Sequence, residues 1–175
     1  EKKALLDGPC SNPHALLGLH TNATGELGFR ALLPDAVKVE VVDLSVDPPR
    51  PQSIPQVDRR GLFEGPVVGH AQSFRGRLRV EWNDREREEF FDPYGVDPAF
   101  SCADFEPFGR GEDPFAHRKL GAHPRTMEDV SGYGFAVWAP RASSVSLLGE
   151  FNDWNERRHR MRCLGDSGIW EIFIP

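Results

Sequence analysis

The sequence has few residues of the kinds that build metal centres or disulfide frameworks. It contains three cysteines in 175 residues, at positions 10, 102 and 163, and none of them forms a C-x-x-C pair. An odd number of widely spaced cysteines indicates neither a disulfide framework nor a zinc site. We therefore expect no metal site and no cofactor, and a reducing, cytoplasmic setting.

Long apolar runs and an excess of positive charge are also missing. No stretch approaches the roughly 20 apolar residues that cross a bilayer, and no signal-peptide order of charged, apolar and small residues occurs. The net charge is -6, with a pI near 5.5. Because nucleic acids and anionic membranes bind clustered positive charge, we expect neither as a partner. The basic run at 157–162 is interpreted as a solvated hairpin surface.

The sequence also lacks a recognisable catalytic set. There is no glycine-rich phosphate loop and no G-x-S-x-G elbow. A glycosidase needs two carboxylates about 5 to 9 Å apart across a cleft. Glu86, Glu88 and Glu89 lie among arginines, as on a solvated face. We therefore predict no catalytic residue in this chain.

What the sequence does contain is a series of short β patterns. Apolar and small or polar residues alternate over 135–138 and 145–148, which predicts two strands around the corner Ala139-Pro140-Arg141. The run 169–174 is rich in β-branched and aromatic residues and predicts another strand. Near the start, residues 2–6 predict the end of a helix. Asn12 and Pro13 predict a short helical turn. The short strands at regular spacing favour β-sandwiches over a helical or βαβ plan.

The first half of the chain repeats the second half. Aligning 28–42 with 134–148 superposes Gly, Phe, Pro, Ala and Val at corresponding positions, and 62–66 falls where 170–172 falls. In the first copy two more strands follow, around the turn Asn83-Asp84-Arg85. We predict two copies of one β unit, the second without a closing hairpin. That difference predicts a bare sheet edge, with Ile172 and Ile174 partly uncovered.

The predicted fold class is all-β, with two tandem immunoglobulin-like β-sandwiches, the second truncated. The predicted domains are residues 1–105 and 106–175. Within the first, strands run from Glu26 to Phe91, with alternation at 37–41, and 47–51 is a proline-rich loop. Residues 92–131 read as a connection that packs its aromatic side chains on the sandwiches, namely Tyr94, Phe100, Phe105, Phe108 and Phe115.

The candidate binding residue is Trp154, which lies in the polar turn 149–155. A tryptophan on such a turn can place its ring on the apolar face of a sugar, while Asn152 or Asp153 hydrogen-bonds the hydroxyls. The same ring could instead close the end of the sandwich as a core residue, and the residues alone leave both interpretations open. For Trp138, Trp170 and Trp82, which lie on predicted strands, the structural interpretation is favoured.

These segments together resemble the bacterial glycogen branching enzymes. GFAVWAP at 134–140 resembles the family's strand-and-corner signature, and GEFNDWN at 149–155 resembles its FNxW turn. RRHRM at 157–161 with SGIWE at 167–171 resembles the following hairpin. LGAHP at 120–124 and NPH at 12–14 resemble the starts of the second module and of the extra N-terminal module.

The resemblance implies the non-catalytic N-terminal part of a cytoplasmic enzyme that cuts α-1,4-glucan and rejoins it as α-1,6 branches. The expected partners are α-1,4-glucan, such as glycogen or malto-oligosaccharides, and the enzyme's own catalytic barrel. Glucan stacking carries over onto Trp154. Two alternatives remain open: a stand-alone carbohydrate-binding or scaffold protein, and the N-terminal part of a debranching or trehalose-forming enzyme. We expect both ends of this sequence to be cut points within a longer protein rather than natural termini.

Overall fold

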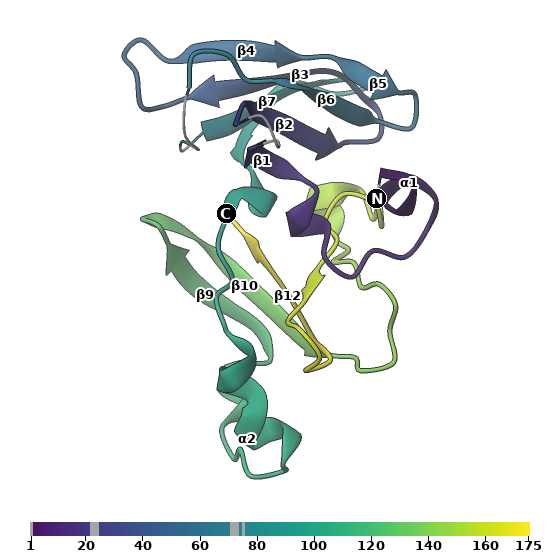
Figure 1. Ribbon diagram of the computed structural model, residues 1–175, viewed down its shortest axis with the longest axis vertical. Helices are drawn as coiled ribbons and strands as arrows, with labels where there is room; N and C mark the ends of the chain where they lie inside the picture. The colour runs from purple at the N-terminus through teal and green to yellow at the C-terminus, as the bar shows by residue number, and fades with distance from the viewer. Residues whose placement is uncertain (1, 22–24, 71–73, 75) are drawn as a thin grey trace. The chain divides into compact units, whose positions relative to one another are not determined.

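The computed structural model describes residues 2–21, 25–70, 74 and 76–175 (Figure 1). Backbone contacts divide the chain into two compact units. Unit 1 comprises Glu1–Gly8 and His14–Gly95, and unit 2 comprises Pro9–Pro13 and Val96–Pro175. This division lies ten residues before the predicted boundary at 105/106, and the limits of the domains themselves stay a prediction.

Among its described residues, unit 1 contains two antiparallel four-stranded sheets, with the orders β1-β2-β6-β5 and β4-β3-β7-β8. The predicted all-β class is confirmed. The predicted opening helix is α1, and the predicted turn after Asn12 is the 3-10 turn η1. The bounds are α1 Lys2–Asp7, η1 Pro13–Ala15, β1 Gly18–Thr21, β2 Leu27–Leu32, β3 Ala36–Asp43, β4 Arg50–Ile54, β5 Gln56–Asp58, β6 Leu62–Pro66, β7 Gly76–Trp82, β8 Glu88–Phe91 and η2 Pro93–Gly95.

The core of unit 1 takes side chains from both of its sheets, as a sandwich requires. Phe29 and Phe63 come from the first sheet, and Val39 and Val80 from the second; all four are at most 2% exposed. The alternation predicted for β3 fails at Val37, which is 56% exposed. A shift of register between Ala36 and Lys38 places Val37 outside the core.

Among the strands that the sequence analysis did not predict, two contain proline within the strand. β4 includes Pro51, from the predicted proline-rich loop, and β9 (Gly121–Met127) includes Pro124, from the predicted connection. Each is an outermost strand of its sheet. An edge strand tolerates proline because one side of its backbone needs no ladder hydrogen bond. The prolines therefore mark edge strands, whereas we had interpreted them as loop residues.

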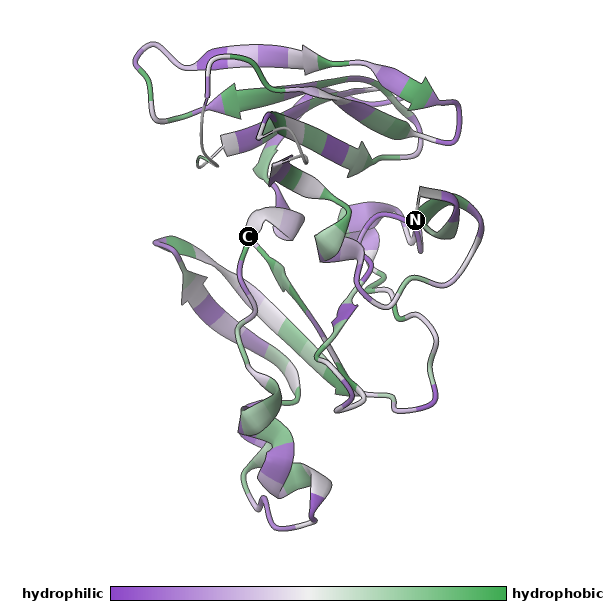
Figure 2. Cartoon of the chain, viewed as in Figure 1, coloured by the Kyte–Doolittle hydropathy of each residue, from purple (hydrophilic) through white to green (hydrophobic). Residues whose placement is uncertain are grey.

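Unit 2 contains one antiparallel sheet among the described residues, with the order β11-β12-β10-β9. The predicted strand at 169–174 is confirmed as β12, and Figure 2 shows it as largely hydrophobic. The predicted strand at 145–148 is wrong, since only a single bridge joins Ser146 to Arg160. The remaining bounds are η3 Cys102–Phe105, α2 Glu106–Gly109, η4 Ala116–Arg118, β10 Val130–Trp138, η5 Glu150–Asn152, β11 Arg162–Cys163 and β12 Ile169–Ile174.

The bare sheet edge predicted for unit 2 does not lie at β12. That strand is interior to the sheet, between β11 and β10, and Ile172 is 0% exposed. Exposed apolar residues lie instead on β10, where Tyr133 is 55% and Val137 is 41% exposed. They pair with Ile174 and Trp170 of β12 and so lie on the same face of the sheet as those residues. The prediction for Ile172 was therefore wrong.

The opposite face of this sheet is covered by the segment that follows residue 95. Phe105 is 3% exposed in a cluster with Ala136, Leu164 and Ile169, and Phe100 and Phe108 pack against it. The predicted packing of connection aromatics is confirmed for these three phenylalanines. Phe115 is 52% exposed and carries the Arg118 guanidinium over its ring instead.

The predicted repeat is visible as the same strand pairing in both units. In unit 1, β2 pairs antiparallel with β6, and in unit 2, β10 pairs antiparallel with β12. These four strands lie within the segments that the sequence alignment matched, but β3 has no counterpart strand at 145–148. The unit 1 copy continues into β7 and β8, which belong to its second sheet.

Candidate functional site

The candidate turn, Gly149–Asn155, is closed by two chain segments that lie side by side. The Leu147 amide donates to the His159 carbonyl at 2.9 Å, and the Met161 amide donates to the Val145 carbonyl at 2.8 Å. Between these bonds the Ser146 hydroxyl donates to the Glu156 carbonyl at 2.7 Å. The turn is therefore anchored at both of its ends.

Within the turn the backbone folds back on Gly149. The carbonyl of Gly149 accepts from the amides of Asn152 at 3.2 Å and Trp154 at 3.0 Å. Asp153 and Trp154 both have left-handed backbone angles, with φ of 54° and 56°. Aspartate tolerates this region, but an aromatic residue there is uncommon. Such strain persists only where surrounding contacts hold it, and it concentrates at functional positions.

Asn152 supplies the contacts that hold the turn from inside. It is 0% exposed. Its Oδ1 accepts from the Gly149 amide at 3.0 Å, its Nδ2 donates to the Leu147 carbonyl at 2.7 Å, and Nδ2 also lies 3.0 Å from His159 Nδ1. One acceptor and both donors of the amide are therefore engaged within the protein.

These bonds determine the protonation state and the tautomer of His159. Since the Gly149 amide can only donate, the atom facing it must be Oδ1, and Nδ2 then points to Leu147 and His159. Nδ1 of His159 must therefore accept, which requires a neutral ring protonated at Nε2. Burial, with a smaller contribution from the Arg158 charge, lowers the pKa of His159 to about 4. The ring is neutral at physiological pH.

Trp154 lies on the outside of this turn and is 66% exposed. The preceding Asp153 accepts from Arg158 Nη1 at 2.7 Å, and Arg158 itself is 5% exposed. Phe151 and Leu148 are 51% and 43% exposed. The turn thus presents a large aromatic surface to solvent on a backbone held by buried polar contacts. That arrangement can stack on an apolar ligand face.

The other tryptophans differ from Trp154. Trp82 and Trp170 are buried, and their indole nitrogens donate to Glu88 Oε2 and to the Ala139 carbonyl, both at 3.1 Å. Their predicted structural role is confirmed. Trp138 is 54% exposed, although its ring contacts Phe108 edge-on at 5.5 Å. Sequence reasoning missed this exposure because alternation alone does not show which face of a sheet is covered.

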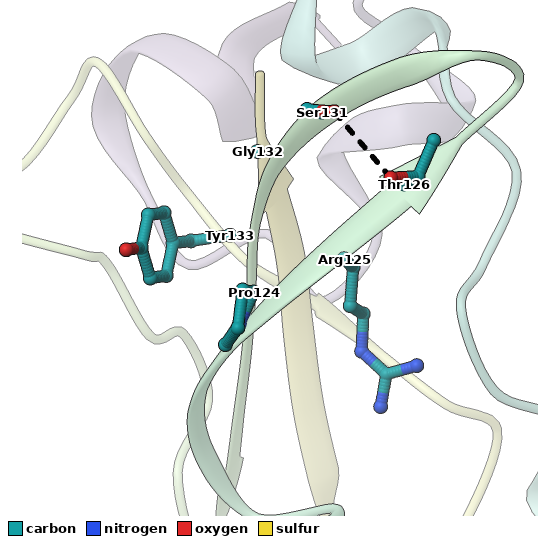
Figure 3. A pocket seen from close by; sticks show the side chains of 6 residues that line it. All are labelled: Pro124, Arg125, Thr126, Ser131, Gly132 and Tyr133. Carbon is teal, nitrogen blue, oxygen red and sulfur yellow. Dashed lines mark hydrogen bonds between the residues drawn. The ribbon is translucent and has the colours of Figure 1, made fainter.

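A shallow hollow lies on the hairpin of β9 and β10 (Figure 3). It has a volume of about 460 Å³. Ser131 and Thr126 hydroxyls lie 3.4 Å apart on it. Tyr133 and Arg125 point in different directions from the hairpin, so its side chains do not converge on one ligand (Figure 3). The lining residues are Pro124, Arg125, Thr126, Ser131, Gly132 and Tyr133.

Within residues 2–21, 25–70, 74 and 76–175, no three His, Cys, Asp or Glu side chains are grouped as a metal site would need. Over the same described part of the chain, no helix is long and apolar enough to span a membrane.

Comparison with known families identifies both units. Residues 1–94 match the family described as the N-terminal domain of alpha-1,4-glucan branching enzyme GlgB. The chain belongs to this branching-enzyme family. Residues 119–175 match carbohydrate-binding module 48, the isoamylase N-terminal domain. The candidate turn lies within this second match.

Two curated branching-enzyme relatives extend the match over the whole chain. The 1,4-alpha-glucan branching enzyme GlgB of Rhodopseudomonas palustris is 43% identical over 175 residues, or 100% of this chain. The enzyme of the same name from Rubrobacter xylanophilus is 40% identical over 173 residues, or 99% of this chain. The chain spans 23% of the length of each relative. The resemblance seen in the sequence motifs is therefore confirmed.

Proposed function

We propose that this chain is the non-catalytic, glucan-contacting N-terminal part of a branching enzyme. The parent would cut α-1,4-glucan chains and rejoin the pieces as α-1,6 branches, with its chemistry on a separate catalytic barrel. The branching-enzyme name of the matching family and of both relatives supports this parent over a debranching or trehalose-forming one. The proposed compartment is the cytoplasm, consistent with three free cysteines.

The observation that carries the glucan part of the proposal is the presentation of Trp154. The indole is 66% exposed on a turn whose buried amide is fully engaged. A flat, rigid aromatic surface suits the apolar face of a glucose ring, and a fixed turn lowers the entropy lost on binding. A single platform binds weakly, so we expect a dissociation constant near the millimolar range, about -4 kcal/mol.

The two predicted sugar-contacting residues take different roles in this proposal. Trp154 is the stacking platform. Asn152 is proposed as the residue that holds the platform in place, because it is 0% exposed and its amide is hydrogen-bonded to Gly149, Leu147 and His159. A sugar hydroxyl could reach Asn152 only by displacing one of these bonds, which would leave a buried polar group unsatisfied.

A titration of the full chain with maltoheptaose, monitored by calorimetry or NMR, tests whether Trp154 binds glucan. We expect weak binding by the unaltered chain and none by Trp154→Ala. Trp138→Ala is the matched control, because Trp138 is also an exposed tryptophan of unit 2, 54% exposed, but lies outside the turn. Equal binding by the unaltered chain and Trp154→Ala would remove Trp154 from the site. Cellohexaose, with β-1,4 links, should bind less than maltoheptaose.

The non-catalytic assignment has a separate test. The purified chain should change neither the iodine colour of amylose nor its number of reducing ends. Turnover that follows the chain through purification would overturn this assignment, while leaving the binding result unaffected.

A further inference from the structure

His159 is a half-buried polar side chain that the proposed stacking role does not use. It lies at the foot of the Gly149–Asn155 turn, and its backbone carbonyl accepts from Leu147. The sequence analysis placed it only within a basic run. Its ring has two neighbours on the turn: the Asn152 amide, at 3.0 Å from Nδ1, and the Phe151 ring, with centroids 5.4 Å apart.

The polar contact links His159 to the backbone that carries Trp154. Nδ1 accepts one proton of the Asn152 amide, Oδ1 of Asn152 accepts the Gly149 amide at 3.0 Å, and the Gly149 carbonyl accepts the Trp154 amide at 3.0 Å. Three hydrogen bonds, joined through the covalent bonds of Asn152 and Gly149, therefore connect the imidazole with the Trp154 amide. Loss of the His159 acceptor would leave a proton of the Asn152 amide unsatisfied inside the protein, which favours turn conformations that release the amide to water.

We propose that His159 is a positioning residue of the glucan site, and that its Nδ1 holds Asn152 and thereby the turn in the form that presents Trp154. This inference rests on the proposed glucan-binding function. The lowered pKa of His159, about 4, agrees with it, because the ring then keeps an acceptor nitrogen at neutral pH. The charged group beside the ring is Arg158, whose guanidinium is engaged with Asp153.

The role of the acceptor can be separated from the role of the ring by two substitutions. Asparagine places an oxygen near the position of Nδ1 but cannot pack on Phe151. Leucine keeps an apolar side chain of similar size but offers no acceptor. Positioning through the hydrogen bond therefore predicts that His159→Asn keeps function and His159→Leu loses it. Simple packing predicts the reverse.

The experiment measures maltoheptaose binding by the full-length chain and its variants at pH 7.5 and 10 °C. We expect His159→Leu to bind at least about fivefold more weakly, since one lost buried hydrogen bond lowers the population of the competent turn by that factor or more. His159→Asn should stay within about twofold of the unaltered chain on the same argument. Binding retained by His159→Leu, or lost equally in both variants, would overturn the proposal.

A second measurement distinguishes failure of this inference from failure of the proposed function. Amide hydrogen exchange at Gly149 and Trp154 reports the turn without any sugar. If the unaltered chain does not bind maltoheptaose, the proposed function fails, and the exchange data still decide the positioning role. Faster exchange in His159→Leu than in His159→Asn supports positioning, and equal rates in the two variants contradict it.

Discussion

The Nδ2 atom of Asn152 lies 3.0 Å from Nδ1 of His159, and the direction of this hydrogen bond is set by a third group, the Gly149 amide. Because that amide can only donate, Asn152 must present its oxygen to Gly149 and its nitrogen to His159. A proton on Nδ1 would face the protons of Nδ2. The turn that presents Trp154 is therefore compatible only with an imidazole that carries no proton on Nδ1.

The first prediction is that protonation of His159 destabilises unit 2 in mild acid. The folded pKa is about 4 and the ordinary value is 6.5, so the unfolded chain binds the proton first as pH falls. Stability from this group is present in full above pH 6.5 and is lost as pH falls toward about 4. The loss should approach about 3 kcal/mol.

Urea unfolding at several pH values between 4 and 7.5 measures this loss. Carboxylates also titrate at the lower end of that range, so His159→Asn is the control, since it keeps the carboxylates and removes the imidazole. The difference in stability between the unaltered chain and His159→Asn should change with pH in this window. A constant difference would show that His159 does not titrate with a lowered pKa.

The second prediction is that Asn152→Asp raises the pKa of His159. One carboxylate oxygen can still accept the Gly149 amide, but the other then faces the Leu147 carbonyl and Nδ1 of His159. A protonated Nδ1 would donate to that oxygen, so the charged ring is favoured. The His159 ring signal, followed by NMR through a pH titration, should move at a higher pH in this variant than in the unaltered chain. An unchanged or lower value would contradict the assigned hydrogen-bond direction.

How much of this site the sequence could predict depended on what each pattern encodes. The turn itself followed from Gly149 and the clustered polar residues, because turn chemistry is local. The exposure of Trp154 did not, because the residues alone allowed both a stacking and a core role. The role of Asn152 did not, because a short polar side chain can bond to its own backbone or to a ligand, and only burial distinguishes the two. The role of His159 did not follow either, because its position in a basic run predicts only a solvated surface, and the contact of its ring with Asn152 is tertiary information.

The fold was predictable to a similar extent. β12 is rich in β-branched and aromatic residues and was located correctly, whereas β4 and β9 carry prolines and were missed. Whether a proline ends a strand or only marks a sheet edge depends on which neighbours pair with it, and that is tertiary information. Residues 145–148 have a strand-like alternation but pair with 159–161 through only one bridge. Alternation indicates burial of one face, and it does not guarantee a ladder.

The third prediction concerns a buried ion pair that holds the segment after residue 95 against the unit 2 sheet. Arg162 Nε lies 2.6 Å from Glu171 Oε1, and both residues are at most 8% exposed. Oε2 of Glu171 also accepts from the Ala99 amide at 3.2 Å, and Arg162 Nη1 donates to the Val96 carbonyl at 3.1 Å. Glu171→Gln leaves the arginine charge buried and uncompensated. We expect a loss of about 3 to 5 kcal/mol in unfolding free energy.

Chemical denaturation with two further variants checks this expectation. Glu112→Gln removes one of two acidic partners of the exposed Arg110 and should cost at most about 1 kcal/mol. Replacing both buried partners, as Arg162→Met with Glu171→Leu, should recover much of the loss, because no charge remains buried. Equal effects of Glu171→Gln and Glu112→Gln would show that the buried pair is solvated.

The last prediction compares the two copies of the repeated β unit. β2 and β10 are equivalent strands, and each is hydrogen-bonded to a neighbour on both sides, β2 to β1 and β6 and β10 to β9 and β12. They differ in what covers their faces. The buried side chains of β2 contribute to a core shared by two sheets, whereas Tyr133 and Val137 of β10 are 55% and 41% exposed. Local opening requires less free energy where fewer apolar contacts are broken. Unit 2 should therefore open before unit 1 melts.

Hydrogen exchange of equivalent amides decides this prediction within one molecule. Phe29 and Phe135 occupy matching places in the repeat, so each is the other's control. We expect the Phe135 amide to exchange at least about tenfold faster, which corresponds to about 1.4 kcal/mol less free energy of opening. Placing a small polar side chain on the exposed face, as in Val137→Thr, should change this ratio little, because that face is already in contact with water.

Equal protection at Phe29 and Phe135 would mean that the face of β10 is covered in solution by a second copy of the chain or by the segment from 139 to 161. Sedimentation at two concentrations would distinguish these, because only association with a second copy depends on protein concentration.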